Sequence, residues 1–116
     1  MRTSFRILIL DKNKIKVSEK LDIDNKNLTR AIKYIHKSQY IEASKWLFLA
    51  NDSKEKYLLL SLISFALKQE DQALNYFENA KDFTYLYKEH FDVYIQKPGE
   101  PVEYAEDFMR SLFLAS

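Results

Sequence analysis

Side chains that could perform catalysis are few in this sequence, and they are not grouped by type. His36 and His90 are the only histidines, and neither belongs to a short metal-ligand motif such as two histidines four residues apart. There is no cysteine, so a thiolate zinc site, a disulfide and a cysteine nucleophile are all excluded. Four carboxylates lie close together in sequence: Glu100, Glu103, Glu106 and Asp107. Their spacing is ordinary for the first turns of a helix, where carboxylates favourably meet the helix dipole.

Glycine and proline are also too scarce for most catalytic loops. The single glycine and both prolines lie within residues 98–101, so the chain has no glycine-rich phosphate loop and no glycine-flanked serine nucleophile. We therefore expect no catalytic residues, no metal site and no cofactor, and we predict that the protein is not an enzyme.

The composition predicts a mainly α-helical globular domain. The 116 residues are 47% hydrophobic and 30% charged, which is typical of a globular chain, and this length fits one domain over 1–116. Few glycines and prolines together with many leucines, lysines and glutamates favour helices joined by short polar turns. The chain begins differently, because isoleucine and valine alternate with lysine after a turn-like Asp-Lys-Asn-Lys. Residues 4–18 are therefore predicted to form a β-hairpin or an extended arm.

From about Asp24 the apolar residues follow a helical period, and about six helices are expected. They group into a first helical hairpin at 24–50, a second at 54–81 and a third, imperfect one at 83–114. Within these, helices are predicted at about 24–37, 40–50, 54–68, 70–81, 83–96 and 101–114.

A shift of 30 residues overlays the first hairpin on the second. Ala31 falls on Ser61, Ala43 on Ala73 and Ala50 on Ala80, so small residues recur where two helices would approach closely. The residues expected to pack the repeat are small or apolar, namely Ala31, Ala43, Leu47 and Ala50 in the first copy and Ser61, Ala73, Phe77 and Ala80 in the second.

This pattern of small and aromatic residues resembles the tetratricopeptide repeat, a helix-turn-helix unit of about 34 residues. The resemblance implies two to three antiparallel helical hairpins whose first helices line a concave groove for a partner. Carried over to this chain, the lining is Leu28, Ile32, Ile35, Leu58, Leu62, Phe65 and Tyr85. These residues are apolar, so the clamp for a C-terminal carboxylate that some members use is not expected here. The other interpretation is a plain helical bundle in which the alanine spacing is coincidental.

The resemblance favours a non-catalytic protein–protein interaction module, namely an adaptor or chaperone that holds an apolar helix or peptide. Two other uses of the groove stay open. It is filled internally by the 4–18 segment or by the C-terminal helix, or it forms the interface of a homodimer, which would make the chain a self-associating structural or regulatory subunit.

The charge is uneven along the chain. Residues 1–40 contain ten Lys or Arg and four Asp or Glu, whereas residues 41–116 contain eight and thirteen. A basic end of this kind fits an acidic partner or the acidic end of another copy. Binding of single-stranded nucleic acid is less favoured, because the net charge is only +1 and no recognised motif is present. The longest apolar run covers 57–67, well short of the roughly 20 residues that span a bilayer. A cytoplasmic location is expected.

Overall fold

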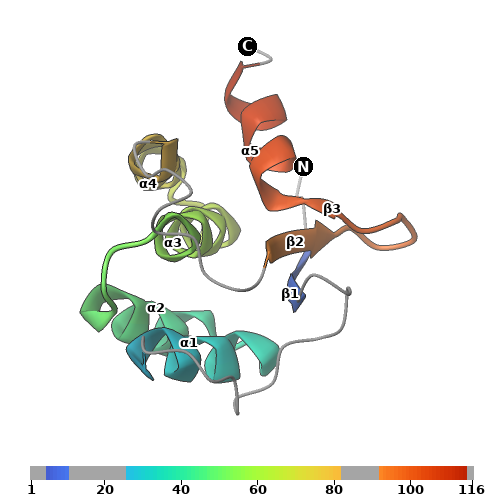
Figure 1. Ribbon diagram of the computed structural model, residues 1–116. Coiled ribbons are helices and arrows are strands. Elements are labelled where there is room, and N and C mark those ends of the chain that lie inside the picture. The colour runs from blue at the N-terminus through green and yellow to red at the C-terminus, as the bar shows by residue number, and fades with distance from the viewer. Residues whose placement is uncertain (1–4, 11–25, 82–91, 115–116) are drawn as a thin grey trace.

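The computed structural model describes residues 5–10, 26–81 and 92–114, which form five helices and three short strands (Figure 1). In chain order these are β1 (Arg6–Leu10), α1 (Lys26–His36), α2 (Tyr40–Leu49), α3 (Lys54–Ala66), α4 (Glu70–Lys81), β2 (Asp92–Gln96), β3 (Glu103–Tyr104) and α5 (Ala105–Leu114). The four helices from α1 to α4 are stacked on one side, and the sheet and α5 lie on the other.

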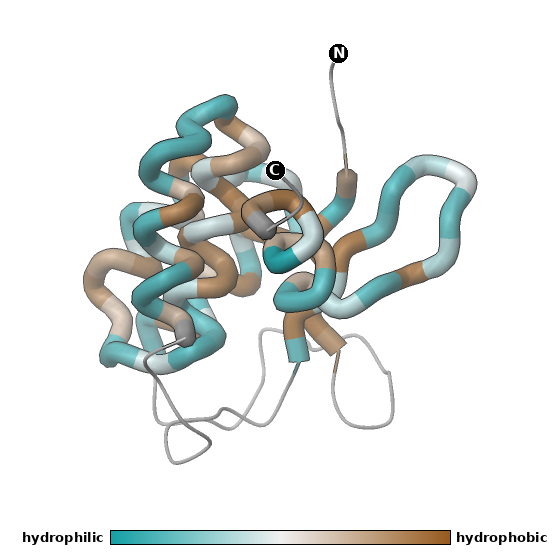
Figure 2. Tube along the Cα trace, turned by 90° about the horizontal axis from the view of Figure 1, so that it is seen from above, coloured by the Kyte–Doolittle hydropathy of each residue, from teal (hydrophilic) through white to brown (hydrophobic). Residues whose placement is uncertain are grey.

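The helices pack as two consecutive pairs, α1 with α2 and α3 with α4, each joined by a three-residue connection. Helix α3 is the most central, because it contacts α2, α4, α5 and β2 and nine of its thirteen residues are buried. Its start is fixed by Ser53, whose side-chain oxygen accepts a hydrogen bond from the Lys56 amide at 3.1 Å. Viewed from above, hydrophilic and hydrophobic segments alternate along the helices, as expected when only part of each helix faces the core (Figure 2).

The 30-residue repeat seen in the sequence is present in the turn geometry as well. Ser38 and Lys68 both have positive φ, 59° and 65°. The residue after each is a glutamine, and the two glutamine amides form equivalent hydrogen bonds. The Gln39 amide donates to the carbonyl of Tyr34 at 2.9 Å, and the Gln69 amide donates to that of Ser64 at 2.8 Å. Each of these bonds reaches five residues back along the chain. Beside them, the Ser38 amide donates to Ile35 and the Lys68 amide donates to Phe65, three residues back, and the two kinds of bond together define a Schellman motif at the end of a helix. Two copies of one helix-turn-helix unit therefore follow each other.

Replacing Lys68 by glycine is expected to raise the free energy of unfolding by about 0.5–1 kcal/mol. A left-handed backbone costs an L-residue about 1–2 kcal/mol, and only part of this gain is offset by the greater freedom of glycine in the unfolded chain. Urea denaturation measures the change. Lys68→Ala is the matched control, because it removes the same charge but keeps the Cβ atom. An equal gain in both variants would mean that the charge, and not the backbone conformation, is responsible.

The three strands form one antiparallel sheet in the order β1-β2-β3. Leu8 is opposite Tyr94 and Ile7 is opposite Ile95, so the sheet joins the two ends of the described chain. Ile7 and Ile9 are buried on one face of β1, while Leu8 is only half-buried on the other. The sheet touches the helices through β1 on α1 and β2 on α3, and α5 packs against α3, β2 and β3.

Two predictions about these segments are wrong. The helix expected over 83–96 is strand β2 from Asp92 to Gln96, because its Val-Tyr-Ile core pairs with the N-terminal strand rather than coiling on itself; residues 83–91 lie outside the described part. The described residues consequently hold five helices, not six. The last helix begins at Ala105 rather than near 101, because Glu103 and Tyr104 extend the sheet as β3. Strand β1 agrees with an extended N-terminal segment, while the second half of the predicted hairpin, 11–18, lies outside the described residues.

Candidate functional site

The predicted partner groove is not open in the structure. Of its seven residues, six are described, and all except Phe65 are buried, with Leu28, Ile32 and Leu62 completely inaccessible. Phe65 is partly buried and packs against the core. Tyr85 lies outside the described residues. The first helices of both pairs therefore bury these side chains within the domain.

Aromatic rings from both ends of the chain pack against Phe65. Phe5, just before β1, and Phe108, on α5, each lie with their ring centroids 6.1 Å from that of Phe65, and their own rings are 5.3 Å apart. A second contact joins α5 to α4, where the Phe113 and Phe77 rings are 5.8 Å apart. The sheet and α5 thus occupy the face where the resemblance places a partner.

The residues expected to pack the repeat lie where close helix contact requires them. All eight are buried, namely Ala31, Ala43, Leu47, Ala50, Ser61, Ala73, Phe77 and Ala80. Ser61 shows why its position is small, because its hydroxyl donates a hydrogen bond across the α3–α4 contact to the carbonyl of Ala73 at 2.6 Å. A larger side chain has no room at this distance.

The exposed apolar side chains of the first pair lie on α2. Ile41, Phe48 and Leu49 are 62%, 58% and 65% exposed, and we call these three residues the α2 apolar face. The Phe48 ring lies 6.5 Å from that of Tyr76 on α4, which extends the apolar surface towards the second pair. Lys45 crosses the same side of the helix and is 3.0 Å from Glu42. The sequence gives no sign of this face, because α2 is apolar around much of its circumference and no period marks its outer side.

The solvent side of α1 is strongly basic. Lys26, Arg30 and Lys33 on α1 and Lys37 in the turn directly after it are all exposed, and their spacing of four, three and four residues forms one row, which we call the α1 basic face. The Arg30 guanidinium lies 4.9 Å from the ring of Trp46 on α2. The row contains four of the ten Lys and Arg residues that make the first 40 residues basic.

One cation is buried between the two pairs. The Lys56 ammonium donates to the carbonyl of Ala50 at 2.8 Å and to the Asp52 carboxylate at 3.2 Å. The hydrogen bond from Lys56 is the main reason why the pKa of Asp52 lies below its usual range, and a hydrogen bond from the Tyr57 hydroxyl is the second reason. Burial, with Asp52 as a second cause, raises the pKa of Tyr57. Lys56 is fully engaged by the connection between α2 and α3, which makes its role structural.

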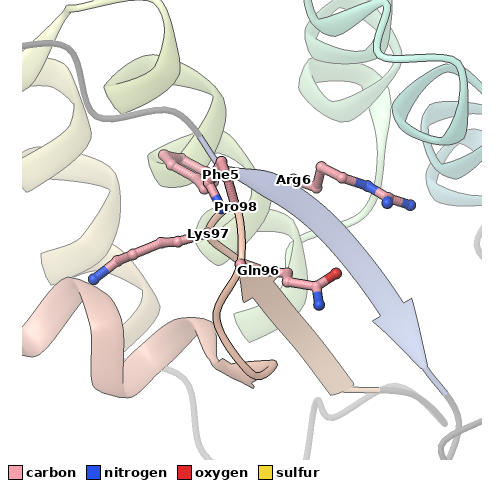
Figure 3. Close-up of a pocket in the computed structure, with 6 residues that line it drawn as sticks. Phe5, Arg6, Gln96, Lys97 and Pro98 are labelled. Carbon is pink, nitrogen blue, oxygen red and sulfur yellow. The ribbon is translucent and has the colours of Figure 1, made fainter.

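A shallow pocket lies where β1 meets the loop after β2, lined by Phe5, Arg6, Gln96, Lys97, Pro98 and Gly99 (Figure 3). Its two cations point apart, with the Arg6 guanidinium directed away from the pocket and the Lys97 ammonium directed towards α5, where it lies 5.2 Å from the Phe108 ring. Gln96 is held by donating to the Glu100 carbonyl at 3.2 Å. No convergent set of donors for a ligand arises here.

The sheet carries a stacked pair of tyrosines. Tyr94 and Tyr104 face each other on β2 and β3 with their rings 4.7 Å apart. Hydrogen bonding with the Tyr104 hydroxyl, aided by burial, raises the pKa of Tyr94 to about 12. Tyr94 therefore stays neutral through the physiological range and acts as a packing residue.

Two of the carboxylates first considered for chemistry form ion pairs. Glu106 pairs with Lys54 at 3.0 Å and with Arg110 at 3.5 Å, while Asp107 also contacts Arg110. His36 lies at the end of α1, and His90 falls outside the described residues. Within 5–10, 26–81 and 92–114 no group of three or more His, Cys, Asp or Glu side chains is placed to hold a metal ion. None of the helices in this part of the chain has the length and apolar character to cross a membrane.

Comparison with models of known protein families, with curated proteins and with solved structures gives no match.

Proposed function

We propose that this protein is a non-catalytic protein–protein interaction module, a small helical-repeat adaptor or chaperone of tetratricopeptide type. Two successive helix-turn-helix units with the same turn geometry support the repeat. The described side chains expected to line a partner groove are buried or partly buried within the chain, so the partner contacts the α2 apolar face instead. Three large apolar side chains, each more than half exposed on one helix, are the observation that carries this proposal.

The chemistry of the partner follows from the shape of this face. Ile41 and Phe48 are seven residues apart, which is two helical turns, and Leu49 lies beside Phe48. Anchors spaced in this way fit the apolar side of an amphipathic helix, which presents its own residues at i, i+3 or i+4, and i+7. The charged pair on this side, Glu42 with Lys45, is mutually neutralised, so the contact is expected to depend weakly on salt.

A photo-crosslinking residue in place of Leu49, used in the native host, would identify the partner segment in contact with α2. Binding of that segment, made as a peptide, is expected to weaken about tenfold or more in Phe48→Asp, because a charge then replaces a central apolar anchor. Leu112→Asp is the control, since Leu112, like Phe48, is an exposed large apolar side chain but lies on α5. Circular dichroism verifies that both variants are folded.

Two results would contradict the proposal. The first is unchanged binding of the crosslinked segment by folded Phe48→Asp. The second is an equal loss in Leu112→Asp, which would show that the effect is not specific to α2.

A further inference from the structure

We propose that the α1 basic face is a docking surface for the acidic side of α4 (Glu70, Asp71 and Glu78) in a second copy of this chain, so that copies associate head to tail. The contact uses α1 and α4 rather than the α2 apolar face, and it therefore stands independently of the proposed function.

The first argument is the unbalanced charge of α1. The helix contains no aspartate or glutamate, and its four-residue and three-residue spacings bring each exposed cation next to another of the same sign. Neighbouring like charges destabilise a helix. Within the described residues, no ion pair joins Lys26, Arg30, Lys33 or Lys37 to a carboxylate. A row of this kind is stabilised when an acidic surface lies against it.

The second argument comes from the repeat. A shift of 30 residues carries the first three cations of the α1 basic face onto Lys56, Leu60 and Ile63 of α3, which are buried to 6%, 2% and 2% exposure. Lys56 marks where the first pair covers this face of α3, because it binds the carbonyl of Ala50 at the end of α2. The corresponding face is thus a packing surface on α3, in the second helical pair. On α1, in the first pair, it is solvent-exposed and cationic. A helix that packs there must be acidic.

The third argument is that this chain carries such a helix. Glu70, Asp71 and Glu78 of α4 are all exposed, and none forms an ion pair with a basic residue of the described part. Asp71 and Glu78 are two turns apart, about 10.5 Å along the helix, as are Lys26 and Lys33 on α1.

The side chains between these charges also correspond. Asn75 is exposed and lies between Asp71 and Glu78, so the three follow each other at spacings of four and three residues. These are the spacings that separate the first three cations of the α1 basic face. A carboxylate then meets Lys26 and another meets Lys33, and Asn75 between them offers an amide oxygen that accepts a hydrogen bond from Arg30. The helices are nearly equal in length, eleven and twelve residues, which lets the two rows lie along each other.

The contact joins two different surfaces, so two docked chains together still have one free α1 face and one free α4 face. Such a heterologous contact produces open chains unless the rotation between copies closes a ring. Because exposed ion pairs are individually weak and are screened by salt, the association is expected at low ionic strength and high protein concentration.

Sedimentation velocity over a concentration series tests this on the full chain. In about 10 mM salt, where screening extends over roughly 30 Å, the weight-average sedimentation coefficient should rise with concentration. In about 1 M salt, where it extends over roughly 3 Å, the rise should disappear. One variant reverses α1 (Arg30→Glu with Lys33→Glu) and the other reverses α4 (Asp71→Lys with Glu78→Lys), and each alone should remain monomeric.

The decisive measurement is the mixture of the two reversed variants. The reversed α1 of one then meets the reversed α4 of the other, so equal amounts should recover the association that each has lost. Recovery also shows that neither variant failed to fold. Arg6→Glu with Lys68→Glu is the control for the α1 variant, since both residues are exposed outside α1, the change in net charge is the same, and the variant should associate as the unmodified chain does.

Three outcomes would overturn the proposal: a monomer at every concentration in low salt, reversed variants that associate as strongly as the original, or a mixture that recovers nothing. A single-stranded oligonucleotide serves as the competing anion. If the unmodified chain stays monomeric but binds this oligonucleotide, and reversal of α1 abolishes that binding, the basic face recognises nucleic acid instead.

Discussion

Leu62→Asp is expected to unfold the protein. Leu62 lies in the middle of α3 and is completely inaccessible to solvent. Loss of a buried leucine costs about 2–5 kcal/mol, and a carboxylate without a partner in the same place adds a desolvation cost of several kcal/mol. Together these approach the whole stability of an ordinary domain, about 5–15 kcal/mol. The expected result is loss of the cooperative thermal transition in circular dichroism.

The same substitution at Leu67 is the matched control, because Leu67 ends the same helix but is 39% exposed. It should leave the transition nearly unchanged. The pair of variants also distinguishes two arrangements of the fold. If the first helices lined an open groove, Leu62→Asp would be tolerated and would only impair binding. A folded Leu62→Asp variant with nearly original stability would therefore contradict the covered face described above.

The parts of the fold that the sequence predicts well are those that local spacing determines. The small residues Ala43 and Ala73 recur 30 positions apart because each packs where two adjacent helices touch, and both are completely buried. The turns at Ser38 and Lys68 repeat with them, although neither carries the glycine that usually marks a left-handed helix end. A serine and a lysine do not signal a left-handed conformation, so the conformation of these two turns is known only from the structure.

Long-range pairing explains the main error. Strand β2 lies in a segment whose tyrosines and phenylalanine also fit a helical period, and its partner β1 is at the opposite end of the chain. No local pattern shows which distant segment a strand will join. The run Val93, Tyr94 and Ile95 is nevertheless rich in β-branched and aromatic residues, and this preference is the one local sign of a strand.

Periodicity predicts the apolar face of the first helices but not what covers it. Leu28, Ile32 and Ile35 share one side of a helix, and the structure buries that side. Whether the chain itself or a partner covers it cannot be read from spacing, because strand β1, which packs on α1, is far away in sequence. The exposed side of α2 escapes prediction for a related reason: Ile41 and Phe48 resemble core residues until the tertiary arrangement leaves them outside.

Phe108→Ala is expected to lower the free energy of unfolding by about 3–5 kcal/mol, the usual cost of removing a buried aromatic ring. Phe108 is 4% exposed and lies between two further rings, those of Phe5 and Phe65. It is therefore the side chain of α5 that joins the N-terminal strand to the central helix. Its loss leaves a cavity at the point where the sheet and the helices meet. Urea denaturation gives the change in free energy.

Two comparisons show whether the loss comes from this contact. Phe48→Ala removes the same atoms from a ring that is 58% exposed, and it should change stability by less than about 1 kcal/mol. Hydrogen exchange then locates the effect. If α5 holds the sheet on the helices, the amides of β1 should lose protection in Phe108→Ala before those of α3, because β1 is then released first. A loss below about 1 kcal/mol would mean that the helical pairs are stable without this cover and that their apolar face is open to a partner. Exchange that increases equally in all elements would mean that the sheet and the helices unfold as one unit, so that Phe108 does not hold β1 selectively.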